Sequence, residues 1–97
     1  MNKQKKILIV EDDTILLNLL KDKLIKENFD VSFVSQGDLA IEEIENNKPD
    51  LILLDMLLPG MSGMEILETK HKNNDIKDIP VIIISNSGQP IEISKVK

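Results

Sequence analysis

The sequence has no cysteine, tryptophan, tyrosine or arginine among its 97 residues, so all twelve basic residues are lysines. Without cysteine, disulfides and thiolate metal sites are excluded. The lysines form no basic stripe and the net charge is −5, so direct nucleic-acid binding is not expected. No apolar run approaches the length of a membrane span, and the stretch ILIV after the first residues is too short for a secretory signal. A single cytoplasmic domain over residues 1–97, away from membranes, is predicted.

The chain is organised around residues 49–63, PDLILLDMLLPGMSG. The run from Leu51 to Leu54 has no polar alternation, which is typical of a parallel strand covered on both faces. It ends on Asp55, at the sheet edge where open α/β sheets place ligand sites. A turn follows, and Ser62 with Glu65 matches a capping box, so a helix is predicted to begin after Ser62. Taken alone, Asp55 could equally be an ordinary turn residue.

Strand and helix patterns alternate along the rest of the chain. Strands are predicted at 6–10, 30–34 and 79–84, the second as an alternating edge strand. Helices are predicted after Asp13 with Asn28 at the end, after a cap within Ser35–Asp38, and from Pro90 onward. Such alternation requires a parallel sheet with right-handed crossovers, so the predicted fold class is a three-layer α/β domain.

The apolar patterns of the first and third predicted helices indicate which of their residues face inward. For the first helix, the expected apolar stripe consists of Leu16, Leu20 and Leu24, widened by Leu17, Leu19 and Ile25. For the third helix, the expected inward residues are Met64 and Leu67, followed by Lys70 or His71. His71 is the only histidine and is expected to be a solvated surface residue, remote from the carboxylates.

Polar groups follow three of the strands at one edge of the predicted sheet: Glu11-Asp12-Asp13, Asp55 and Ser85. If the first and third strands are neighbours, two or three carboxylates converge. Two like charges 4 Å apart repel by roughly 4 kcal/mol at an effective dielectric near 20, so a raised pKa or a divalent cation must offset this. Ligands that are all oxygen favour Mg²⁺, with Mn²⁺ or Ca²⁺ as alternatives. An aspartate beside Mg²⁺, with a hydroxyl opposite, suits phosphoryl transfer.

The strings ILIVEDD, PDLILLDMLLPGMSGMEIL and IPVIIISNSG resemble the receiver domain of bacterial two-component response regulators, in the same order and spacing. The resemblance implies a flavodoxin-like, doubly wound parallel sheet of strand order 2-1-3-4. It also implies phosphorylation on aspartate by a histidine kinase or phosphotransfer protein. The implied role is a phosphoacceptor in signalling, with self-catalysed phosphotransfer as the most chemistry expected.

The resemblance assigns a role to each residue of the acidic edge. Asp55 matches the phosphoacceptor. Glu11 and Asp12 match the acidic pair that holds Mg²⁺, with Asp12 the expected direct ligand. Leu57 would offer its backbone carbonyl to the metal. Ser85 matches the hydroxyl residue whose rearrangement reports phosphorylation.

The sequence departs from the family after the fourth strand. Receiver domains continue through a fifth strand, which ends on an essential lysine, and a fifth helix; Lys95 and Lys97 lie too close to Ser85 to take that role in the same chain. Weak phosphorylation is therefore expected. The fourth strand, from Val81 to Ile84, is expected to leave an open apolar edge, which favours a homodimer paired through that strand or by domain swapping.

Two functions other than phosphoryl acceptance are alternatives for this sequence. One is a binding or dimerisation module on the same scaffold, with phosphorylation impaired. The other is an aspartyl-phosphate phosphatase, which is disfavoured because Leu57 stands where a second acid would be needed two residues after Asp55.

Overall fold

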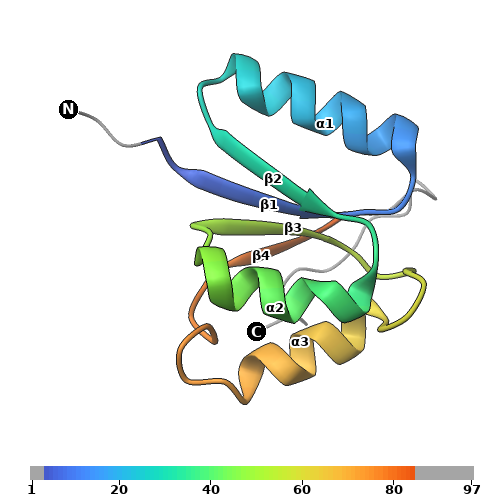
Figure 1. The fold of residues 1–97 in the computed structure, drawn as a ribbon, viewed down its shortest axis with the longest axis vertical. Coiled ribbons are helices and arrows are strands. Elements are labelled where there is room, and N and C mark those ends of the chain that lie inside the picture. The colour runs from blue at the N-terminus through green and yellow to red at the C-terminus, as the bar shows by residue number, and fades with distance from the viewer. Residues whose placement is uncertain (1–3, 85–97) are drawn as a thin grey trace.

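The apolar runs of the sequence form a four-stranded parallel sheet in the order β2-β1-β3-β4 (Figure 1). The structure, a computed structural model, describes residues 4–84. Its strands are β1 (Lys6–Val10), β2 (Asp30–Val34), β3 (Leu51–Asp55) and β4 (Val81–Ile84). The predicted flavodoxin-like fold class and strand order are confirmed, and β2 lies at an edge as its alternating pattern indicated.

Helices cover both faces of this sheet. They are α1 (Thr14–Lys26), α2 (Gly37–Asn47) and α3 (Gly63–His71). Figure 1 shows α1 on one face, with α2 and α3 together on the other. Among residues 4–84, none of the helices combines the length and the apolar character needed to cross a membrane. The helix predicted from Pro90 lies outside the described residues.

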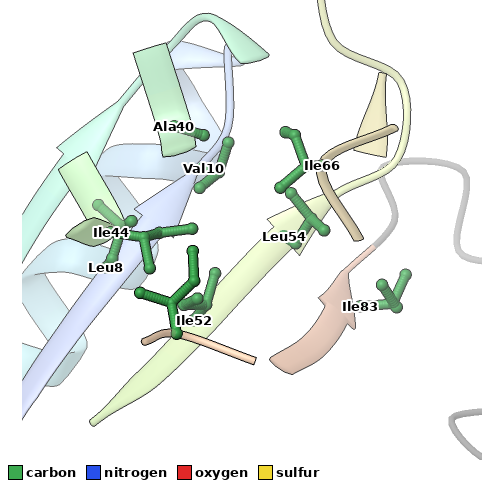
Figure 2. Close-up of a cluster of buried hydrophobic side chains, with 9 residues drawn as sticks. Leu8, Val10, Ala40, Ile44, Ile52, Leu54, Ile66 and Ile83 are labelled. Atoms are coloured by element: carbon green, nitrogen blue, oxygen red, sulfur yellow. The ribbon is translucent and has the colours of Figure 1, made fainter. Parts of the chain in front are cut away.

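The two central strands are buried on both sides, which explains why their sequences do not alternate. Successive side chains of a strand point to opposite faces, so each strand supplies both cores. On the side of α2 and α3 the core consists of Leu8, Val10, Ala40, Ile44, Ile52, Leu54, Ile66, Ile76 and Ile83 (Figure 2). On the side of α1 it consists of Ile7, Ile9, Leu17 and Leu53. The paired strands β1 and β3 thus have core side chains packed on both faces.

The inward face of α1 is narrower than the sequence indicated. Leu17 is buried, and Leu20 and Leu24 pack against the same core. The expectation that Leu19 and Ile25 widen the stripe is wrong, because they are 65% and 53% exposed. At 3.6 residues per turn, Leu19 lies about 200° around the helix from Leu17 and faces away from the sheet.

The inward face of α3 also differs from the expected one. Met64 was expected inside but is 54% exposed, whereas Ile66 is buried. Lys70 does point inward as expected: it is only 6% exposed, and its Nζ donates to the Lys77 carbonyl at 2.9 Å. Burial lowers the pKa of Lys70 from its usual value of 10.5, and the charge of Asp78 opposes that shift.

Two predicted element starts differ from the structure, α2 in the chemistry of its cap and β4 in its first residue. The helix α2 begins after Gln36, which makes no side-chain capping bond, so the cap predicted within Ser35–Asp38 is wrong in its chemistry. The strand β4 begins at Val81 rather than Ile79, because the Ile79 N–H donates to the Ile76 carbonyl in a turn and Pro80 has no N–H. The capping box of Ser62 and Glu65 at α3 is confirmed.

Candidate functional site

The pairing of β1 with β3 brings two carboxylates together at the carboxyl edge of the sheet. Val10 is in register with Leu54, so Glu11, which follows β1, and Asp55, the last residue of β3, lie at the same level. Glu11 is fully buried and Asp55 is 4% exposed. Two acidic side chains therefore lie inside the protein at adjacent strand ends.

Asp12 completes an acidic cluster with these two residues. One carboxylate oxygen from each of Glu11, Asp12 and Asp55 lies within 4.8 Å of the others. Asp12 is the exposed member, so the cluster opens to solvent on its side. Two ionised carboxylates at this distance repel by about 3 kcal/mol at an effective dielectric near 20. Three oxygen donors, with no histidine or cysteine among them, fit a hard divalent cation such as Mg²⁺.

Asp13, the third acid of the same run, has a different role. Its Oδ1 accepts hydrogen bonds from the N–H groups of Ile15 at 2.9 Å and Leu16 at 3.2 Å, which makes it the N-cap of α1. Its own N–H donates to Oε2 of Glu11 at 2.9 Å. The run Glu11-Asp12-Asp13 thus divides between the cluster and the start of a helix.

The backbone after β3 holds the Asp55 carboxylate. The Leu57 N–H donates to Oδ1 of Asp55 at 3.1 Å, and the Leu57 side chain is 84% exposed. Further along, the Pro59 carbonyl accepts from the Gly37 N–H at 3.1 Å. The Gly63 N–H donates to the Met56 carbonyl, also at 3.1 Å. The loop from Met56 to Ser62 is therefore tied to both α2 and α3.

The remaining residues of the predicted site are placed as follows. Ser85 lies outside the described residues. His71 is exposed at the end of α3, and among residues 4–84 it belongs to no group of potential metal ligands. Sequence reasoning missed Gly37 as a contact of this loop. A glycine in the first turn of a helix was the one signal that could have drawn attention to it.

The sequence and the fold are similar to those of known proteins. The family model for the response regulator receiver domain matches residues 7–97. The phosphate regulon transcriptional regulatory protein PhoB of Rhizobium meliloti (strain 1021) is 34% identical over 87 residues, which are 90% of this chain and 38% of that protein. The DNA-binding response regulator MtrA of Mycobacterium leprae (strain TN) is 28% identical over 90 residues, or 93% of this chain and 39% of that protein. The chain thus spans about two-fifths of the length of these curated relatives.

Solved structures agree with the family match. The N-terminal domain of a response regulator receiver protein from Methanoculleus marisnigri JR1 superposes with a TM-score of 0.84 at 26% identity, covering 93% of this chain and 72% of that one. The BeF3-activated receiver domain of RstA from Klebsiella pneumoniae gives 0.78 at 32% identity, covering 93% and 73%.

Proposed function

The chain belongs to the response regulator receiver domain family of two-component signalling systems, and from that premise we propose that Asp55 accepts a phosphoryl group with the help of Mg²⁺. The donor would be a histidine kinase or a phosphotransfer protein. The observation that carries the proposal is the meeting of Asp55 with Glu11 and Asp12 at one sheet edge. The domain would act as a signalling acceptor, with no catalytic turnover of its own on other molecules.

The proposed chemistry divides between the side chains of the cluster. A carboxylate oxygen of Asp55 forms a bond to phosphorus while the bond from phosphorus to the donor's nitrogen breaks. Asp55 is oriented for this step by the Leu57 N–H and shielded from bulk water by its burial. Glu11 and Asp12, together with Asp55, would hold the cation. When bound, Mg²⁺ supplies positive charge that offsets the carboxylates and the phosphoryl oxygens.

Two further roles stay predictions within this proposal. The Leu57 carbonyl would be an additional metal ligand, and the Ser85 hydroxyl would respond to the phosphoryl group. The proposal includes no nucleic-acid contact for this domain, since its net charge is −5 and it has no arginine. The DNA binding named for MtrA belongs to a protein of which the chain matches 39%.

The test is a Mg²⁺ titration followed by labelling with a small phosphodonor. Wild type should bind Mg²⁺ and become labelled on Asp55, even if slowly. Asp55→Asn should abolish the label, and Asp12→Ala should weaken Mg²⁺ binding by about 10-fold or more, since it removes a charged ligand. Asp22→Asn, which removes an exposed acid of α1, is the control and should change neither the labelling of Asp55 nor the affinity for Mg²⁺. Labelling that survives in Asp55→Asn would contradict the proposal.

A second candidate is a dimerisation module with impaired phosphorylation. Among the described strands β4 pairs with β3 alone, and Ile82 on β4 is 39% exposed. An apolar strand edge is a template for pairing with a second chain. This candidate predicts dimers in sedimentation experiments, together with no Mg²⁺ binding. A monomer at high micromolar concentration would rule it out.

A further inference from the structure

The first turn of α2 contacts the loop that follows Asp55. A helix begins with N–H groups that have no partner inside the helix, and a side chain before the helix usually accepts from one of them. Gln36 does not do so in α2. Instead the Gly37 N–H donates to the Pro59 carbonyl at 3.1 Å. The loop therefore accepts a hydrogen bond from the first N–H group of α2, and the same hydrogen bond fastens the loop to the helix.

The contact at Gly37 is closer than any other residue type could make. A Cβ atom at this position would lie 1.7 Å from the Met61 carbonyl oxygen and 2.6 Å from its carbon. Both are backbone atoms, so no side-chain rotation could relieve the overlap. The loop would have to move.

A second contact joins the same two segments. Gly60 has a φ of +81°, in the left-handed region that favours glycine. A Cβ atom there would lie 2.8 Å from Oδ1 of Asp38, the residue after Gly37. Two successive residues of α2 thus lie against two successive residues of the loop, Gly60 and Met61.

A short stretch of backbone joins this contact to the acidic site. Pro59 is two residues from Leu57, whose N–H donates to Oδ1 of Asp55 at 3.1 Å. At its other end the loop is fastened by the bond from the Gly63 N–H to the Met56 carbonyl. We propose that Gly37 is a positioning residue for phosphoryl acceptance: its close approach to Met61 sets the Leu57 backbone relative to Asp55. This inference rests on the function proposed above.

The decisive variant is Gly37→Ala. In an ordinary helix this change is favourable, because alanine has the higher helix propensity. Here it should displace the loop instead. Displacing a positioning group by about 1 Å can slow a reaction on the order of 100-fold, so we expect labelling of Asp55 to slow by about 10- to 100-fold at saturating phosphodonor, with weaker Mg²⁺ binding.

Ile44→Val is the matched control for stability. Ile44 lies in the same helix and is fully buried in the core, away from the loop contact. The Ile44→Val variant should have a lower melting temperature, while the labelling rate and Mg²⁺ affinity of the folded protein stay unchanged. Both variants are assayed at a temperature where thermal unfolding shows that they are folded. If the control loses labelling as Gly37→Ala does, the effect is one of stability and the inference is wrong.

A measurement on wild type keeps the inference testable if Gly37→Ala does not fold. Because the Gly37 amide bonds to the loop, Mg²⁺ at the acidic cluster should shift its NMR resonance and slow its hydrogen exchange. The amide of Ala40, one turn further into α2, should respond less. An unaltered Gly37 amide at saturating Mg²⁺ would refute the inference.

The inference and the proposed function fail in different ways. Wild type that neither binds Mg²⁺ nor accepts phosphate overturns the proposed function and this inference with it. If wild type binds Mg²⁺ and accepts phosphate, and Gly37→Ala does so at the same rate and affinity, only the positioning role of Gly37 is overturned. A slow Gly37→Ala beside a normal Ile44→Val supports both.

Discussion

Replacing Asp55 with asparagine should make the metal-free protein more stable. The change keeps the size of the side chain and an oxygen that can accept from the Leu57 N–H, as Oδ1 does now at 3.1 Å. It removes one negative charge from a position that is 4% exposed. The carboxylates of Glu11 and Asp12 are then no longer repelled by a third negative charge.

The magnitude follows from the distance within the cluster. Two ionised carboxylates with oxygens up to 4.8 Å apart repel by about 3 kcal/mol at an effective dielectric near 20. Because Asp12 is exposed, solvent screens its part of this repulsion. We expect Asp55→Asn to raise the free energy of unfolding by about 1–3 kcal/mol without metal. For a domain of this size, each 1 kcal/mol corresponds to about 4–8 °C in Tm.

Saturating Mg²⁺ should reverse this difference and make wild type more stable than Asp55→Asn. A ligand at 100 times its Kd stabilises the folded state by about 2.7 kcal/mol. Wild type should gain roughly that amount, and Asp55→Asn should gain much less because one of the proposed ligands has lost its charge. The assay is urea unfolding at neutral pH, in chelator and in saturating Mg²⁺. Asp22→Asn removes the same charge from an exposed position of α1 and should shift stability by less than about 0.5 kcal/mol in either condition.

Two results would refute this reasoning. If Asp55→Asn were less stable than wild type in chelator, charge repulsion would not dominate the cluster. If Mg²⁺ stabilised both proteins equally, Asp55 would not be one of its ligands.

Other parts of the structure make separate predictions. Asp13→Ala should cost about 1 kcal/mol of stability in urea unfolding through loss of the α1 cap, with Mg²⁺ affinity unchanged; a loss of affinity like that of Asp12→Ala would contradict the division of roles. Ile76→Ala should cost about 2–5 kcal/mol, because Ile76 is fully buried. For Lys70, burial lowers the pKa below 10.5, so the folded state gives up its proton before the unfolded state does. Wild type should therefore gain stability relative to Lys70→Met as pH rises towards 10.5 and lose it as pH falls; unfolding curves with the same difference at neutral and alkaline pH would contradict this.

The order of elements and the chemistry of the edge could be predicted from the sequence because both depend on local patterns. The unalternated runs before Glu11 and Asp55 indicate strands buried on both faces, and parallel strands end at a common edge. The capping box of Ser62 and Glu65 is a local motif that involves only its own helix, so it too could be predicted from the sequence. From these alone the meeting of Glu11, Asp12 and Asp55 could be inferred, given that β1 and β3 are neighbours.

Which side of a helix faces the sheet was less predictable. Leu19 and Ile25 are as apolar as Leu17, yet they are 65% and 53% exposed. Apolar residues of α1 lie outside the buried stripe as well as within it, so the pattern alone does not set the width of the inward face. The choice is made by the position of the helix over the sheet, which brings Leu17 against Ile7 and Ile9.

By itself, then, the sequence determined the alternation of strands and helices and the acids that end two of the strands, because hydrophobic period and side-chain type are local properties. Only the tertiary structure decided that Gly37 contacts Met61 and that Leu19 and Ile25 face away from the sheet. Those outcomes depend on distances between segments far apart in the chain. Such distances are set by how the layers pack.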